Sequence, residues 1–229
     1  MSERNCIEFK DIRYCYEEVC AVEHISFDVP KNTFTALVGP NGGGKSTLLK
    51  LLTGLLKPDK GSIVVKDSAL VGYVPQENGF DRTFPMTVFE LVLSGTLSRR
   101  IRPFTRYSKQ QREKAGDALL RTGLSGFEKR GIDQLSAGQL KRAVIARALA
   151  SDADIIVLDE PDSSLDIGAA KELYSILKKL KQDKTIIAAS HHVEDVLELA
   201  DKAIYVNKTV TQYEEPEELK RILKKGIII

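Results

Sequence analysis

The nonapeptide GPNGGGKST occupies residues 39–47, and the rest of the chain is arranged around it. It matches the pattern G-x-x-x-x-G-K-[ST] over Gly39–Ser46. Residues 33–38, TFTALV, form a nearly continuous apolar run before it, which is typical of a strand buried on both faces. Residues 46–56, STLLKLLTGLL, repeat leucine at helical spacing after it. The stretch therefore predicts a phosphate-binding loop between a buried strand and a helix.

The residue types of this loop suit a nucleoside triphosphate. Glycines let backbone N–H groups face phosphate oxygens without an intervening Cβ, and the helix N-terminus adds about half a positive charge. Lys45 is expected to reach the β- and γ-phosphates, and Ser46 to ligate Mg²⁺. The predicted nucleotide contacts here are Gly39, Pro40, Asn41, Gly42, Gly43, Gly44, Lys45, Ser46 and Thr47.

Strands that alternate with helices along the chain predict an α/β fold. CIEFKDIRYCY and HISFDVP near the start alternate apolar with polar residues and read as antiparallel strands, whereas DIIVLDEP and TIIAASHH read as short buried strands. We therefore expect a parallel-sheet core with an N-terminal antiparallel β subdomain and an inserted α-helical subdomain. One domain spans 1–229, with the core over about 1–76 and 151–229 and the helical subdomain over about 77–150.

Composition excludes several classes of protein. The 34 Lys and Arg residues nearly balance the 32 Asp and Glu residues, which argues against bulk electrostatic binding of nucleic acid. No apolar run approaches the roughly 20 residues of a membrane span. The three cysteines, Cys6, Cys15 and Cys20, have no metal-ligand spacing, so we expect reduced thiols in a cytosolic protein.

Two acids end one of the buried strands. Asp159 and Glu160 close the run IIVLDEP, and the carboxyl edge of a parallel sheet is where ligands bind in α/β proteins. Asp159 suits the coordination shell of Mg²⁺, directly or through water. Glu160 is aimed differently and is expected to polarise the attacking water as a general base.

A second helix start also has features of a phosphate site. In LSAGQ, residues 135–139, Ser136 is a natural N-cap, and its hydroxyl and the N–H of Gly138 are placed to meet a phosphate together with the helix dipole. The phosphate loop of the same chain already has Lys45 and its own amides. The second set, which ends at Gln139, is therefore most useful to the nucleotide of another molecule.

The order of these motifs resembles that of ATP-binding cassette ATPases, over nearly the whole chain. The resemblance implies a head-to-tail homodimer with two ATP molecules sandwiched, each touching the phosphate loop of one chain and the LSAGQ of the other. The motifs that carry it are GPNGGGKST (39–47), LSAGQ (135–139), IVLDE (156–160), SSLD (163–166) and SHH (190–192).

The resemblance also implies roles for single residues. Tyr16 matches the aromatic residue that stacks on adenine, although Tyr14 could compete. Gln76 matches the glutamine that touches Mg²⁺ or the water, Asp166 a residue that crosses the dimer interface, and His191 the histidine at the γ-phosphate.

Asn32 and the pair Asn207-Lys208 depart from the family pattern. They stand where turn glycines are usual, and because Asn tolerates positive φ we expect the turn at Asn32 to persist.

The family likeness further implies an importer. FPMTV, residues 84–88, resembles the ATPase subunits of zinc, manganese and iron importers, and less closely those of iron-chelate and cobalamin importers. Since the chain has no span, the permease would be a separate subunit, with a solute-binding protein as a further partner and no nucleic acid. The chain would be peripheral on the cytoplasmic side of the cell membrane. The alternative is a soluble, non-transport cassette that acts as a nucleotide switch.

The segment 99–114 is strongly basic. It holds seven basic residues and one acid. Its position suits contact with membrane subunits or anionic headgroups, and a solvated helix face explains it equally well.

Overall fold

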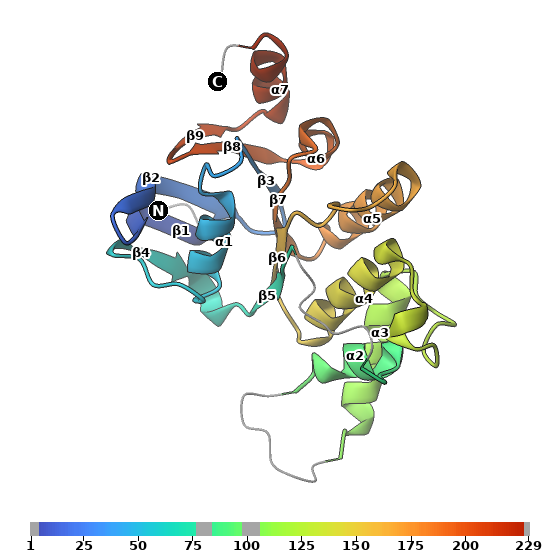
Figure 1. The fold of residues 1–229 in the computed structure, drawn as a ribbon. Helices are drawn as coiled ribbons and strands as arrows, with labels where there is room; N and C mark the ends of the chain where they lie inside the picture. Colours follow the sequence, from blue (N-terminus) through green and yellow to red (C-terminus); the bar gives the residue numbers. More distant parts are fainter. Residues whose placement is uncertain (1–4, 77–83, 98–105, 227–229) are drawn as a thin grey trace.

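A six-stranded sheet forms the centre of the molecule, with strand order β5-β6-β7-β3-β8-β9 (Figure 1). The computed structural model describes residues 5–76, 84–97 and 106–226. In chain order the elements are β1 Asn5–Tyr16, β2 Val19–Pro30, β3 Phe34–Val38, α1 Lys45–Leu52, β4 Lys60–Val65, the short η1 Lys66–Ser68, β5 Val71–Val74, α2 Val88–Ser94, α3 Lys109–Arg121, the short η2 Ile132–Gln134, α4 Ala137–Ala150, β6 Ile155–Asp159, α5 Ile167–Leu180, β7 Thr185–Ala189, α6 Val193–Leu199, β8 Lys202–Asn207, β9 Thr209–Tyr213 and α7 Pro216–Lys224.

The central strands are parallel, so their carboxyl ends meet at one edge. β3 pairs with β7 and β8, and β6 with β5 and β7, all in parallel register, while β9 is an antiparallel edge strand. β3, β6 and β7 are buried along their whole length, as their continuous apolar runs predict. The segments that follow β3, β5, β6 and β7 are therefore brought to one place, although they lie far apart in the chain.

A second, three-stranded antiparallel sheet has the order β2-β1-β4. Helix α1 lies between it and the central sheet (Figure 1), and its leucines Leu48, Leu49, Leu51 and Leu52 share one apolar cluster with both. β4 joins this sheet although it follows α1 in sequence, so the antiparallel part is not wholly N-terminal. The expected α/β class, with its antiparallel region and inserted helices, is confirmed.

Helices α4, α5 and α6 lie on the other face of the central sheet, and α2 and α3 pack against α4 on the side away from the sheet (Figure 1). They share a cluster with the remaining inward side chains of the strands, among them Ile156 and Leu158 of β6. α5 buries Leu173, Ile176, Leu177 and Leu180, the face that its sequence predicts. None of the helices within the described ranges combines the length and the apolar composition needed to cross a bilayer.

Helix α4 buries two of its basic side chains. Lys141 and Arg142 do not lie on a solvated face: they are 3% and 7% exposed. The Lys141 ammonium donates to the backbone oxygens of Pro75 and Gln76 at 3.2 and 3.0 Å, and Arg142 pairs with Glu172 at 2.6 Å. The free-energy cost of burying these two charges is reduced because each of them has hydrogen-bonding partners.

The cysteine prediction was wrong for two of the three residues. Cys15 and Cys20 form a disulfide, because the hairpin of β1 and β2 sets them directly opposite one another in register. The two-residue turn Glu17-Glu18 separates the strands there. Cys6 is buried, and its thiol contacts the hydroxyl oxygen of Thr185 at 3.6 Å.

Candidate nucleotide site

The loop of residues 39–47 folds as a cradle at the carboxyl end of β3. Gly44, the N-cap of α1, has φ +103°, and a Cβ there would lie 2.7 Å from the carbonyl oxygen of Ala21. A side chain would thus displace either the loop or β2, which explains why glycine is required. The Lys45 ammonium donates to the carbonyl oxygens of Gly39 and Pro40, each at 2.9 Å, so it is held over the loop.

Lys45 is also the main positive charge of the site. Its side chain is buried, and burial lowers the pKa of its ammonium, while the Glu160 and Asp159 carboxylates raise it. The opposing carboxylates help to keep the charge that phosphate oxygens need.

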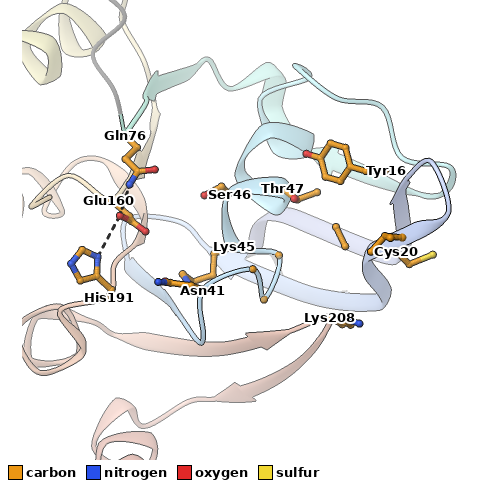
Figure 2. A pocket seen from close by; sticks show the side chains of 15 residues that line it. Tyr16, Cys20, Asn41, Lys45, Ser46, Thr47, Gln76, Glu160, His191 and Lys208 are labelled. Carbon is orange, nitrogen blue, oxygen red and sulfur yellow. Dashed lines mark hydrogen bonds and ion pairs between the residues drawn. The ribbon is translucent and has the colours of Figure 1, made fainter. Parts of the chain in front are cut away.

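A cleft of about 670 Å³ extends along this loop. In Figure 2 Tyr16 lies at one end, Gln76, Glu160 and His191 lie at the other, and Lys45 and Ser46 lie between them. The whole lining is Tyr16, Val19, Cys20, Ala21, Asn41, Gly42, Gly43, Gly44, Lys45, Ser46, Thr47, Gln76, Glu160, His191 and Lys208.

Asp159 lies against the first turn of α1. The Ser46 hydroxyl donates to one carboxylate oxygen at 2.9 Å, and the Tyr73 hydroxyl donates to the other at 3.3 Å. Burial raises the pKa of the Tyr73 phenol, and the neighbouring Asp159 raises it further, so Tyr73 stays a donor. Tyr73 was missed in the sequence, since only the pairing of β5 with β6 brings it here. The three side chains form an oxygen-rich cluster of the kind that Mg²⁺ prefers.

Glu160 is the centre of a second cluster. Its carboxylate accepts a hydrogen bond from the Gln76 amide at 2.7 Å, and His191 Nδ1 lies 3.4 Å from the same oxygen (Figure 2). Its backbone is left-handed, with φ 44°, a conformation that costs free energy in a non-glycine residue and often occurs at functional sites. Three residues from the ends of β5, β6 and β7 thus converge on one point, as their positions in the sequence predict.

Tyr16 and not Tyr14 faces the cleft. Tyr16 is 46% exposed and lines the cleft, whereas Tyr14 packs against the cluster under the antiparallel sheet. The two rings meet edge to face, with centroids 4.9 Å apart. Regular alternation would place both side chains on one face of β1, but the register of β1 against β2 shifts between Tyr14 and Cys15, and this irregularity lets the two rings take different directions. Tyr16 also follows Cys15 directly, so the disulfide lies beside this end of the cleft.

Lys208 lines the cleft, although the sequence patterns indicated no role for it there. It lies at the turn between β8 and β9 with φ 59°, its N–H donates to Gly43 O at 2.9 Å, and it lines the cleft. The turn at Asn32 likewise keeps positive φ, at 54°, as expected. At this turn position, where the family usually has glycine, Lys208 adds a positively charged side chain to the cleft.

Six predicted nucleotide contacts do not line this chain's own cleft. Gly39 and Pro40 lie in the loop, where their carbonyl oxygens accept hydrogen bonds from the Lys45 ammonium. The other four lie elsewhere in the chain: Ser136, Gly138, Gln139 and Asp166. Ser136 caps α4 in a reciprocal pair with Gln139, at 3.2 and 3.0 Å, and is exposed. Asp166 caps α5 and is also exposed. Gly138 is buried, because it packs on Ala169, whose Cβ would lie 2.9 Å from an added Cβ. The starts of α4 and α5 therefore form a separate surface, on which Ser136 and Asp166 are exposed.

The geometry agrees with a comparison to known families. The family model described as "ABC transporter" matches residues 22–163. The chain belongs to the ABC transporter family. It is the ATP-binding, ATP-hydrolysing part of such a transporter.

Two curated relatives of this ABC cassette are metal transport proteins. The manganese transport system ATP-binding protein MntB of Listeria monocytogenes is 37% identical over 214 residues, which is 90% of this chain and 89% of that protein. The zinc uptake system ATP-binding protein ZurA of Listeria innocua is 37% identical over 215 residues, 89% of this chain and 83% of that protein.

Solved structures support the same assignment of the ABC cassette. An inward-facing ABC transporter described as of metal-chelate type matches with a TM-score of 0.84 and 31% identity, over 93% of this chain and 84% of that chain. The dimeric ATP-binding cassette MJ0796 in a post-hydrolysis state, bound to ADP and phosphate, matches with a TM-score of 0.76 and 25% identity, over 90% of this chain and 97% of that chain.

Proposed function

We propose that this ABC cassette powers the import of a transition-metal ion, manganese, zinc or iron. The observation that carries the proposal is the similarity, along nine-tenths of the chain, to relatives named for manganese and zinc transport. The phosphate loop, the acid pair and the cleft between them supply the ATPase that such a transporter needs. The FPMTV motif agrees with this choice, although the preceding residues 77–83 lie outside the described residues.

The cleft suggests a division of labour in ATP hydrolysis. Tyr16 stacks on adenine, the amides of residues 39–47 and Lys45 bind the phosphates, and Glu160 polarises the attacking water. Gln76 and His191 both contact Glu160 and are placed to hold that water and the γ-phosphate. The convergence of Gln76 and His191 on one carboxylate oxygen of Glu160 supports this arrangement.

Ser46, Gln76 and Asp159 are the residues that would hold Mg²⁺. The direct hydrogen bond from Ser46 to Asp159 puts two hard oxygen donors beside the phosphate loop, which fits the ion's preference for oxygen ligands. When bound, Mg²⁺ would neutralise charge on the β- and γ-phosphates.

We expect Lys45→Ala to weaken ATP binding about 10- to 150-fold, because a charged hydrogen bond is worth roughly 1.5–3 kcal/mol. Calorimetric titration with ATP measures this directly. Lys50→Ala is the matched control, since Lys50 lies on the same helix but does not line the cleft, and it should leave affinity unchanged. Equal affinity in Lys45→Ala and the unmodified protein would remove Lys45 from the phosphate site.

A homodimer explains the residues that do not lie in the cleft. Ser136, Gly138, Gln139 and Asp166 would meet the nucleotide and phosphate loop of a second copy, with two ATP molecules between the chains. The exposure of Ser136 and Asp166 on one chain supports this, as does the dimeric state of the similar cassette MJ0796.

The dimer would act on a separate permease subunit, together with a solute-binding protein, on the cytoplasmic side of the membrane. ATP does work only if the closed dimer binds it better than the open one. Moving a population from 1:99 to 99:1 requires about 5.5 kcal/mol of differential binding. Contacts of Ser136, Gly138 and His191 with the γ-phosphate would supply that difference. The basic segment 99–114 is a candidate permease or headgroup contact, although residues 98–105 lie outside the described residues.

Two alternatives make different predictions. The similarity to a metal-chelate type transporter favours an importer for an iron chelate or a cobalamin-type solute as the second candidate. A soluble nucleotide switch would have no permease. Co-purification with a membrane protein of several spans separates that switch from both importers.

Loss of this chain is expected to lower cellular manganese, zinc or iron and to impair growth in chelator. The experiment deletes its gene, measures the three metals in cells, and restores either the native chain or Glu160→Gln; only the native chain should restore uptake. If all three metals are unchanged while uptake of a metal chelate or cobalamin fails, the ion assignment is wrong. If no uptake changes and no membrane partner is recovered, the soluble switch is the better explanation.

A further inference from the structure

One buried carboxylate beside the cleft has no part in the reaction outlined above. Asp162 follows Glu160 by two residues and is 2% exposed. Its side chain accepts a hydrogen bond from the Tyr174 hydroxyl of α5 at 2.7 Å. It also accepts from the Ser190 hydroxyl, at 2.9 and 3.2 Å to its two oxygens. An ionised carboxylate only accepts, so both hydroxyl protons are directed toward it, and charged hydrogen bonds of this kind are strong.

Ser190 links the Asp162 carboxylate to the turn that carries His191. Ser190 is fully buried at the end of β7 and directly precedes His191. Since its proton is donated to Asp162, its oxygen is free to accept, and it does so from the backbone N–H of His192 at 2.9 Å. The His191 side chain is 46% exposed, and its ring is 4.4 Å from that of His192. With so little packing around the ring, the backbone on either side decides where it points.

The backbone of Asp162 belongs to the segment that joins Glu160 to Asp166. The Ser163 hydroxyl and N–H both donate to the carbonyl oxygen of Glu160, at 2.9 and 3.1 Å, and the N–H of Leu165 donates to Asp162 O at 3.2 Å. Asp166 then caps α5, the helix that carries Tyr174. A single carboxylate therefore connects three pieces of the molecule: the segment 160–166, helix α5 and the turn that carries His191.

We infer that Asp162, acting through Ser190, is a positioning residue that holds His191 against Glu160. Any shift of the segment 160–166, whose end Asp166 is exposed at the surface proposed for the second copy, would then move His191 as well. The inference rests on the proposed role of His191 in ATP hydrolysis. The competing explanation is that the three hydroxyl and carboxylate groups only stabilise the fold, as buried hydrogen bonds in general do.

Ser190→Ala tests the connection without changing Asp162. We expect kcat for ATP to fall about 10- to 100-fold, the usual cost of misplacing a reacting group through its supporting partner, with KM changed less than about twofold. Tyr174→Phe is the matched control: it removes the other hydroxyl from Asp162 but leaves the path from Ser190 to His192 intact. It should lower the melting temperature about as much as Ser190→Ala, while kcat stays within about threefold. Ser190→Thr, which keeps the hydroxyl, should restore most of the rate.

The double variant Ser190→Ala/His191→Ala distinguishes positioning from general support. If Ser190 acts through His191, the double variant is no slower than His191→Ala, because the second change has nothing left to misplace. Additive losses, or equal falls in kcat for Ser190→Ala and Tyr174→Phe, would overturn the inference. Should Ser190→Ala not fold, Asp162→Asn, of equal shape, replaces one acceptor oxygen by a donor and is read by the same criteria.

The same experiment separates this inference from the proposed function. If His191→Ala alone leaves kcat unchanged, the proposed role of His191 is wrong and the inference falls with it. If His191→Ala lowers kcat but Ser190→Ala and Asp162→Asn do not, only the positioning role is wrong.

Discussion

Glu160→Gln is expected to lower ATP turnover about 10²- to 10⁴-fold while ATP still binds, because the substitution removes a general base and little else. Glutamine has the same shape as glutamate, so the backbone with its φ of 44° and the contact with Gln76 are disturbed little. An amide oxygen, however, does not take a proton from water. Steady-state phosphate release measures turnover, and calorimetry measures ATP affinity.

A cassette that binds ATP without hydrolysing it should also accumulate as a dimer. Gel filtration with ATP and Mg²⁺ is expected to show the Glu160→Gln variant at twice the mass of one chain. Glu198→Gln on α6 is the matched control: Glu198 is exposed and does not line the cleft, so turnover should be normal. Near-normal turnover in Glu160→Gln, or a monomer at saturating ATP, would exclude Glu160 as the base.

Ser136→Arg is expected to abolish ATPase activity and leave ATP binding by the single chain intact. Ser136 is exposed and does not line the cleft of its own chain. The bulky, charged arginine side chain should therefore block only the approach of a second copy. The change also removes a helix cap, which costs about 0.5–2 kcal/mol of stability by itself. Ser108→Arg is a close control for that cost, because Ser108 caps α3 with the same reciprocal hydrogen bonds, to Gln111.

Mixing Ser136→Arg with Lys45→Ala tests whether Ser136 acts on the partner. Each homodimer then has two defective sites. A mixed dimer joins the intact phosphate loop of one chain to the intact Ser136 of the other at one site. Some activity should return if one site is sufficient, whereas residues acting within one chain give no recovery at any ratio. Wild-type activity of Ser136→Arg alone would rule out the role in the partner's site.

Much of the site could be predicted because its parts are local. A loop such as GPNGGGKST works through its own backbone amides and the helix that follows, so its residue types and spacing carry the chemistry. The acids at the end of β6 are equally recognisable, since an apolar run followed by two carboxylates predicts where a buried strand ends. The amphipathic face of α5 follows from periodicity alone.

Other features depended on which strands become neighbours. Tyr73 meets Asp159 because β5 pairs with β6, and Lys208 enters the cleft because β8 lies beside β3. The burial of Lys141 depends on the packing of α4 near the end of β5, where two backbone carbonyl oxygens accept hydrogen bonds from its ammonium group. Neither residue type nor spacing predicts such contacts, because the partners are separated by tens of residues.

The sequence by itself determined the family, the phosphate loop, the acid pair and the side of the sheet on which they meet, since each is encoded in a short run of residues. Only the tertiary structure decided that Tyr16 rather than Tyr14 faces the cleft, that Cys15 is bonded to Cys20, and that Asp162 joins Tyr174 to Ser190. The physical reason is that strand register and helix packing set these distances. Strand register and helix packing both result from the burial of the whole apolar core, and each short motif supplies only a small share of that core.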